Sequence, residues 1–219
     1  MKKVAVLMSA YNGEKYIREQ IDSVLAQKDV DLTLYIRNDG SKDKTSEILK
    51  EYSKLPNVTV FDEENTGVGI SFMRLVYNVP DTFDYYCFCD QDDIWLPDKI
   101  ISGIDMIEGS DIPMLYTSNQ ELVDSEGKSY DMRYKEIPPF SYKQLVCANR
   151  LAGCTFVWNN RLQKELCAPG HRPDESFFKI RIHDVWVMLV ASLKGKIVYD
   201  SNSHIHYRIH AANVVGTNE

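Results

Sequence analysis

Short apolar runs alternate with stretches in which apolar residues recur every three or four positions over the first hundred residues. The runs at 4–8, 32–36 and 58–61 are typical of strands, and the recurring positions are typical of amphipathic helices. Each run is followed within a few residues by Asn, Asp, Gly or Ser, which favour turns. Ser41 or Asp43 can cap the second helix, and a third is expected to continue to about Val76. The stripes of the first two helices include Ile17, Ile21, Val24, Ile48, Leu49 and Tyr52.

A fourth run, Tyr85–Cys89, is apolar or aromatic on both faces. This pattern fits a central strand of a parallel sheet, which helices cover on both sides. Asp90 follows it directly, and Pro97 is expected at the first position of the next helix. The inner stripe of that helix is Ile100, Ile104 and Ile107. Strands that alternate with helices predict an α/β fold with a doubly wound, mostly parallel sheet and right-handed crossovers.

The second half is less regular, and its elements are expected to be shorter. We expect strands at 114–118, 154–158 and 196–199, a turn at 124–127, a short helix at 141–148, a mobile loop at 171–176 and a buried helix at 185–193. Because no repeat and no low-complexity linker divides the chain, the sequence predicts a single domain over 1–219.

Composition excludes several classes of function. The net charge of −7 argues against a nucleic-acid surface, which needs a basic footprint. No apolar run approaches the roughly 18–20 residues of a membrane-spanning helix. The five cysteines include no Cys-x-x-Cys pair, so neither a disulfide framework nor a zinc site is predicted, and a reduced, cytoplasmic setting is expected.

Three carboxylates stand within four residues directly after the buried run, at Asp90, Asp92 and Asp93. They repel one another, and a divalent cation would supply the missing charge. Oxygen ligands of this kind suit Mg²⁺ or Mn²⁺. The alternative is a solvated acidic turn that caps the helix near Pro97. An ordinary surface turn needs neither the buried strand before it nor Trp95 after it, so we favour the metal site.

The ends of the first two strands carry further polar residues. Ligands bind at the carboxyl ends of the strands in such sheets, so Ser9–Asn12, Asn38–Ser41 and Asp90–Asp93 are expected to lie together. Tyr11 and Asn12 could contact a base, and Asp39 could accept a hydrogen bond from one. Ordinary turns explain the same residues equally well.

Two segments near the C-terminus also carry reactive groups. Asp184, beside His183, begins an apolar helix and is either an N-cap or a general base. Farther on, His204 and His206 are expected on one face of a strand. They could bind a metal, and Arg208 could pair with a diphosphate, but a partly exposed polar strand is the alternative.

Together these pieces resemble the inverting family-2 glycosyltransferases of the GT-A fold over nearly the whole chain. The resemblance rests on the segments 9–13, 38–41, 90–95, 183–184 and 207–210. The form Asp-Gln-Asp-Asp-Ile-Trp and the ending at 210–216 are most similar to bacterial rhamnosyltransferase-type members, which build polysaccharides. The chain departs from the family pattern at two positions: His183 replaces an acid before Asp184, and Asn38 stands where a second Asp is common.

The resemblance implies a nucleotide-sugar-binding half, Rossmann-like, at 1–110 and an acceptor and catalytic-base half at 111–219. Asp184 would be the catalytic base. The expected nucleotide contacts are Ser9, Tyr11, Asn12, Asp39, Asp90 and Arg208. The expected ligands of Mn²⁺ or Mg²⁺ are Asp92, Asp90 and His210, the last favoured over His206. The expected contacts to the sugar or the acceptor are Asp93, Trp95, Gly153, Cys154, His183 and His206.

The implied reaction is a metal-dependent, inverting transfer of a sugar from dTDP-rhamnose or a UDP-sugar. The acceptor would be a glycan or a lipid-linked glycan in bacterial polysaccharide biosynthesis. The implied place is the cytoplasm, with peripheral association at the inner face of the membrane. Two rival interpretations stay open. A sugar-phosphate nucleotidyltransferase would need a basic glycine-rich loop, yet Ser9–Gly13 has no Lys or Arg. A non-catalytic nucleotide-sugar-binding module would need no base.

Overall fold

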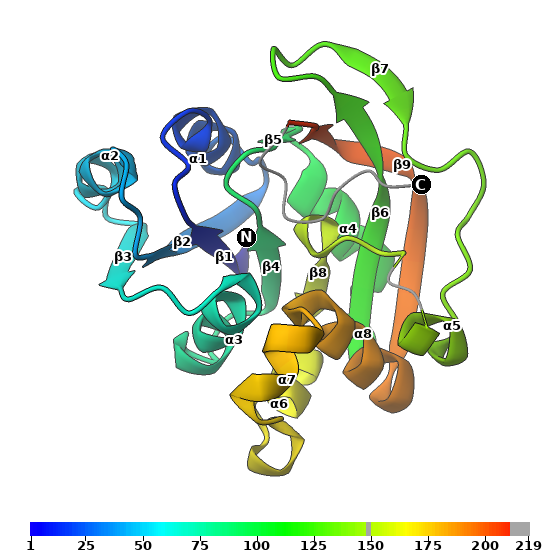
Figure 1. Cartoon of the computed structure of the whole chain (residues 1–219). Coiled ribbons are helices and arrows are strands. Elements are labelled where there is room, and N and C mark those ends of the chain that lie inside the picture. The colour runs from blue at the N-terminus through cyan, green and yellow to red at the C-terminus, as the bar shows by residue number, and fades with distance from the viewer. Residues whose placement is uncertain (148–149, 211–219) are drawn as a thin grey trace.

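The apolar runs of the first half form four strands that lie parallel in one sheet. The computed structural model describes residues 1–147 and 150–210 (Figure 1). The strands are β1 (Lys2–Ala10), β2 (Val30–Asp39), β3 (Val58–Glu63) and β4 (Tyr85–Cys89). The helices between them are α1 (Ile17–Leu25), α2 (Thr45–Tyr52) and α3 (Val68–Asn78). Because β1 pairs in parallel with both β2 and β4, the carboxyl ends of these three strands meet at one edge.

The second half extends the same sheet with both parallel and antiparallel pairs. The full order is β3-β2-β1-β4-β8-β6-β9-β5, and β7 pairs with β6. The added strands are β5 (Ile94–Trp95), β6 (Met114–Val123), β7 (Ser129–Met132), β8 (Val157–Asn159) and β9 (Lys196–Arg208). The added helices are α4 (Lys99–Ile107), α5 (Tyr142–Cys147), α6 (Asn160–Cys167), α7 (Glu175–Ile180) and α8 (His183–Lys194). The predicted α/β class with a mostly parallel central sheet is confirmed.

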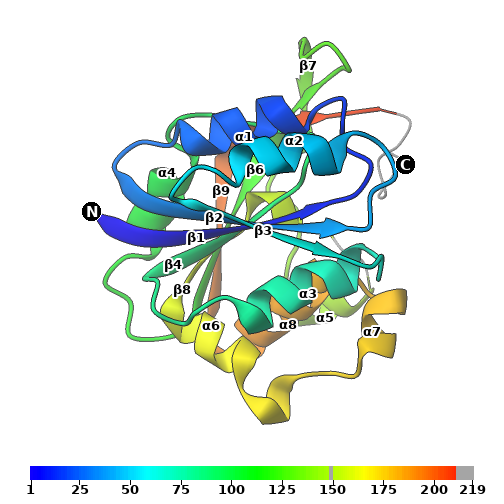
Figure 2. The ribbon, with the colours of Figure 1, turned by 90° about the vertical axis from the view of Figure 1, so that its left-hand side faces the viewer.

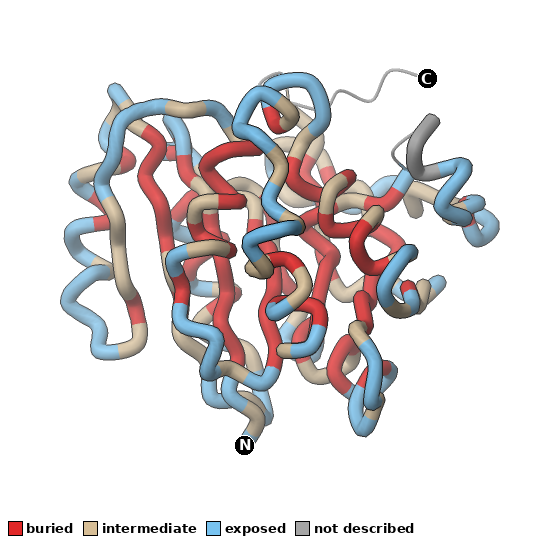
Figure 3. Tube along the Cα trace, turned by 90° about the horizontal axis from the view of Figure 1, so that it is seen from below, coloured by how far each residue is buried: buried red, intermediate tan, exposed pale blue. Residues whose placement is uncertain are grey.

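Helices cover both faces of this sheet, as the side view shows (Figure 2). Helices α1, α2 and α4 lie on one face, and α3, α6 and α8 lie on the other. The strands between these layers are largely buried (Figure 3), and all five residues of β4 are buried. The predicted covering of this central strand on both sides is therefore confirmed. None of the helices in the described residues is long and apolar enough to cross a membrane.

Several boundaries in the second half differ from the prediction. Pro97 lies before the N-cap of α4, so it is not the first helical residue. The expected strand at 154–158 begins instead as a 3-10 turn at Gly153–Thr155 and is extended only in β8. The segment 171–176, expected as a loop, contains the end of a second 3-10 turn and the start of α7. The expected strand at 196–199 is the beginning of the much longer β9. Residue 148 of the expected helix 141–148 lies outside the described residues.

Candidate active site

The three polar clusters predicted at the strand ends do lie together. The Tyr11 N–H donates to Gln91 Oε1 (2.8 Å), and Gln91 Nε2 donates back to the Tyr11 carbonyl (2.9 Å). The Asn12 N–H donates to Ser41 Oγ (3.0 Å), and Asn12 Oδ1 accepts from the Lys42 N–H (2.8 Å). These bonds join the loops that follow β1, β2 and β4 into one surface at the carboxyl edge.

The acidic cluster lies on this edge, directly after β4. Asp92 Oδ2 is 2.9 Å from His210 Nε2. Asp93 is fully buried, and its Oδ1 accepts from the Arg208 N–H (3.1 Å). The interpretation of the cluster as a solvated cap for α4 is therefore wrong, because a capping carboxylate would face solvent at the start of that helix, and the N-cap there is Asp98.

Burial and mutual repulsion perturb these carboxyls. Burial, the Asp92 charge and the Asp184 charge, in that order, raise the pKa of Asp90 to about 7. Burial first, and then Asp92 and Asp90, raise the pKa of Asp93 well above its ordinary value. A divalent cation would relieve this repulsion and ionise the carboxyls.

The residues present fit the Mn²⁺ or Mg²⁺ ion that the family resemblance implies. Asp92 and His210 touch one another and offer an oxygen and a nitrogen, with Asp90 two residues away on the same loop. Among the described residues, however, the compact set of ligand atoms is not this trio. It is Asp90, Asp93 and Cys154, whose ligand atoms lie within 4.8 Å of one another.

Asp184 comes to the site from the first turn of α8. The N-cap of α8 is Ile182, so the interpretation of Asp184 as the N-cap is wrong. Its Oδ1 accepts from the N–H of Val185 (2.7 Å), and its charge acts on Asp90. Asp184 is thus a fourth carboxylate beside the cluster, from a segment about ninety residues farther along the chain.

His183, the residue before Asp184, lies in an aromatic setting. Its ring stacks on Phe72 (centroids 4.0 Å apart) and meets Phe88 edge-on (4.8 Å). Burial lowers the pKa of His183 to about 3, so the imidazole is neutral near pH 7. Neither ring nitrogen has a hydrogen-bond partner among the described residues. His183 therefore acts as a packing group beside Asp184 rather than as a proton carrier.

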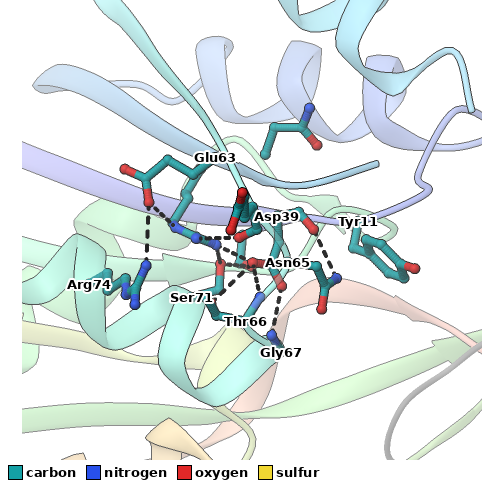
Figure 4. Close-up of polar contacts among 12 residues, drawn as sticks. Tyr11, Asp39, Glu63, Asn65, Thr66, Gly67, Ser71 and Arg74 are labelled. Carbon is teal, nitrogen blue, oxygen red and sulfur yellow. Dashed lines mark hydrogen bonds and ion pairs between the residues drawn. The ribbon is translucent and has the colours of Figure 1, made fainter. Parts of the chain in front are cut away.

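Asp39 is buried in a network that organises the start of α3 (Figure 4). Its carboxylate accepts from the N–H groups of Thr66 (2.8 Å) and Gly67 (3.0 Å). It also pairs with the guanidinium of Arg37, which is itself buried. A contact from Asp39 to a nucleobase stays a prediction. Tyr11, by contrast, is 46% exposed beside the network and offers a free ring face.

Arg208 holds the end of β9 against the acidic loop. It donates from Nε to the Asp92 carbonyl and from Nη1 to the Ser125 carbonyl, both at 2.9 Å. It also pairs with Glu19 (2.5 Å) and lies over the ring of Tyr16 (4.6 Å). The Tyr16 ring in turn lies 5.0 Å from that of His210. The guanidinium is thus engaged by the protein, and its pairing with a diphosphate stays a prediction.

Three of the expected sugar or acceptor contacts are almost fully buried. Trp95 is 2% exposed, Cys154 is 1% exposed and Asp93 is fully buried. Trp95 belongs to the core, where Lys99 Nζ lies 3.7 Å from its ring centroid. These side chains lie in the interior next to the acidic loop, and a direct contact from them to sugar stays a prediction.

The remaining predicted residues are divided between the site and its surroundings. Gly153 lies against Asp184, since a Cβ on it would be 3.3 Å from Asp184 Cβ. Ser9 Oγ shares a hydrogen bond with Ser71 Oγ (2.6 Å), which ties β1 to α3. His206 pairs with Glu121 (3.2 Å), while His204 pairs with Asp98 and Asp200. His210 therefore meets the acidic cluster and His206 does not.

The sequence analysis missed four residues that organise the site. They are Arg37, Lys99, Tyr16 and Glu19. Two of them, Arg37 and Lys99, could have been found from the sequence. An arginine inside an apolar strand, or a lysine beside an inward-facing helical stripe, must be buried with a partner. Tyr16 and Glu19 could not be found in this way, because their partners lie almost two hundred residues away.

Comparison with known proteins points to one family. The family model described as "Glycosyl transferase family 2" matches residues 5–158. A Shigella flexneri protein named dTDP-rhamnosyl transferase RfbG is 30% identical over 96% of this chain and 74% of its own length. An uncharacterized glycosyltransferase of Rickettsia typhi is 29% identical over 98% of this chain and 66% of its own length.

Solved structures share the fold. The Staphylococcus aureus TarS 1–349 complex with UDP-GlcNAc aligns with a TM-score of 0.71 at 18% identity. The alignment covers 96% of this chain and 60% of the TarS chain, so this chain spans less than two thirds of that protein.

Proposed function

Because this chain belongs to glycosyl transferase family 2 and is a glycosyltransferase, we propose that it transfers rhamnose from dTDP-rhamnose, or a sugar from a UDP-sugar, with inversion. The acceptor in this proposal is a glycan or a lipid-linked glycan of a bacterial polysaccharide. A lipid-linked acceptor would bring the protein to the inner face of the cell membrane. The name of the RfbG relative supports dTDP-rhamnose as the first donor to test.

One observation carries the proposal: Asp184, on the first turn of α8, lies against Gly153. The next residue, Cys154, brings its sulfur within 4.8 Å of carboxylate oxygens of Asp90 and Asp93 on the acidic loop after β4. In the proposal, the edge that binds the nucleotide and the group that accepts the proton lie next to one another. A non-catalytic binding module would have no use for the second group. The loop after β1 also lacks the basic residues with which a nucleotidyltransferase would hold a triphosphate.

In the proposed reaction the oxygen of an acceptor hydroxyl attacks the anomeric carbon of the donor. The bond from that carbon to the diphosphate oxygen breaks at the same time, so the configuration inverts. Asp184 takes the hydroxyl proton. A carboxylate is a weak base, but the hydroxyl becomes a much stronger acid as its oxygen bonds to carbon.

The other residues bind and orient the donor. Tyr11 presents an exposed ring at the end of β1, where a nucleobase could stack. Mn²⁺ or Mg²⁺ held by Asp92, His210 and Asp90 would offset the charge that develops on the departing diphosphate. His183 keeps the surroundings of Asp184 apolar because its ring is neutral and packed on Phe72.

A panel of dTDP-, UDP- and GDP-sugars with Mn²⁺ tests the proposal. A ligand at about 100 times its Kd should stabilise the fold by about 2.7 kcal/mol, which is about 5–11 °C in Tm for a chain of this size. The stabilising donor should also release nucleoside diphosphate when an acceptor glycan is added. Binding without any turnover, by hydrolysis or by transfer, would support the binding module instead.

A further inference from the structure

A compact set of metal-binding atoms lies deeper than the pair of Asp92 and His210. Carboxylate oxygens of Asp90 and Asp93 and the sulfur of Cys154 lie within 4.8 Å of one another. Among the side chains that the structure describes, no other group of three His, Cys, Asp or Glu residues brings its ligand atoms so close. Asp90 is partly exposed and the other two are buried, so the set opens to the surface only on the side of Asp90.

Asp93 supplies an independent sign that something binds here. Its Oδ1 accepts from the Arg208 N–H, and no nitrogen or oxygen donor of the described residues reaches its buried Oδ2, so the Cys154 thiol is the donor left to this carboxyl. An unsatisfied buried polar atom costs about 1–3 kcal/mol, and proteins rarely leave one without a partner, of which a bound cation is one kind. Lys99 does not supply the partner, since its Nζ lies over the Trp95 ring and makes no hydrogen bond in the described chain.

Cys154 is held in place as metal ligands usually are. Gln120, also buried, donates from Nε2 to the Cys154 sulfur (3.3 Å). The turn that carries the cysteine is fixed by a hydrogen bond between Thr155 and Thr117 (2.7 Å). Outer hydrogen bonds of this kind orient the first ligands of a metal and tune its affinity. Asp93 and Cys154 each receive one.

We propose that Asp90, Asp93 and Cys154 form a second cation site, selective for Zn²⁺ and chemically similar ions. Two carboxylates and a thiolate suit Zn²⁺, Co²⁺ or Cd²⁺, whereas Mg²⁺ and Mn²⁺ prefer oxygen ligands. The cysteine proton leaves to solvent as the sulfur binds. Because Asp90 also belongs to the proposed donor site, an ion held here inhibits donor binding. That last consequence, unlike the site itself, rests on the proposed function.

Cobalt(II) is the probe, because thiolate ligation gives a charge-transfer absorption band that oxygen ligation does not. Wild type should show this band on Co²⁺ titration. The Cys167→Ser variant, which changes a half-buried cysteine on α6, should keep it, while Cys154→Ser should lose it. Asp93→Asn should weaken Co²⁺ binding by about tenfold or more. Circular dichroism establishes that each variant is folded.

Absence of the sulfur band in the wild type overturns the proposal, whatever the variants do. Persistence of the band in folded Cys154→Ser also overturns it, because another thiol would then be the ligand. The outcome is separable from the proposed function. A wild type that shows the band but no Mn²⁺-dependent stabilisation by any nucleotide-sugar refutes the donor site and leaves the cobalt site standing. A wild type that is stabilised by a nucleotide-sugar with Mn²⁺ but shows no band refutes the cobalt site and leaves the donor site standing.

Discussion

Arg37→Met removes the guanidinium at the centre of the network that holds the start of α3. Its side chain is 2% exposed, and it donates to Glu63 (3.0 Å), Ser71 (3.1 Å) and the Glu64 carbonyl (2.9 Å) besides pairing with Asp39. Removing one partner of a buried ion pair costs about 3–5 kcal/mol, because the other charge is left without compensation. Asp39 keeps two backbone N–H donors, so the lower end applies.

We therefore expect Arg37→Met to cost about 3 kcal/mol, or about 6–12 °C in Tm for a chain of this size. Urea unfolding measures the free energy directly. The matched control is Arg18→Met, which breaks an exposed pair with Glu51 (2.7 Å) on the helical layer of α1 and α2. Since the side chains of Arg18 and Glu51 are 49% and 56% exposed, that change should leave the free energy of unfolding close to the wild-type value.

The double variant Arg37→Met with Asp39→Asn removes both charges. It should be more stable than the sum of the single changes predicts, by about 0.5–3 kcal/mol, because neither partner is then left unpaired. If Arg37→Met costs no more than Arg18→Met, or if the two single costs simply add, the network does not hold Asp39 in the way described.

Three further changes test other parts of the site. Tyr16→Ala should weaken Mn²⁺ binding about tenfold because the His210 ring loses its aromatic neighbour, while Tyr16→Phe should keep the wild-type affinity. Titrations followed by electron paramagnetic resonance measure both affinities, and equal losses in the two variants would contradict a role for the Tyr16 ring in positioning His210. Gly153→Ala should lower kcat but not donor affinity, because its methyl group would press on Asp184; an unchanged kcat would show that the contact relaxes without cost. Because the pKa of Asp90 is raised from 3.8 to about 7, the metal-free fold holds a proton between these pH values that the unfolded chain has released. The contribution of Asp90 to the free energy of unfolding, measured with urea, should therefore fall as the pH rises from about 3.8 to about 7. Mn²⁺ affinity should rise over the same range, and Asp90→Asn should flatten both trends; a trend that persists in that variant would assign it to another group.

The sequence predicted the first half of the fold well because its signals are local. The run Tyr85–Cys89 has the pattern of a strand covered on both faces, and the structure confirms this prediction. Parallel pairing then followed from the alternation of strands and helices, and it brought the loops after β1, β2 and β4 together. In the second half the pattern is set by partners far along the chain. The strand β9 continues through polar residues because β6 and β5 pair with it.

The site was predicted only in part for the same reason. The acidic residues are easy to find in the sequence, but they differ in how deeply each is buried. Burial depends on the tertiary structure and is not visible in the local sequence. Asp93 and Trp95 fall beneath the site because β5 turns them inward against β9. Cys154 carried no motif, since Gln120, Asp90 and Asp93, which approach it, all lie more than thirty positions earlier in the chain.

Asp184→Asn is the most direct test of the central claim that this chain is a glycosyltransferase whose base comes from α8. The variant keeps the size of the side chain and removes its ability to take a proton. Transfer from the donor found in the nucleotide-sugar panel should fall to background, while the Mn²⁺-dependent thermal shift with that donor stays close to that of wild type. Transfer at the wild-type rate would contradict the assignment of the base, and joint loss of donor binding and folding would show that Asp184 has a structural role instead.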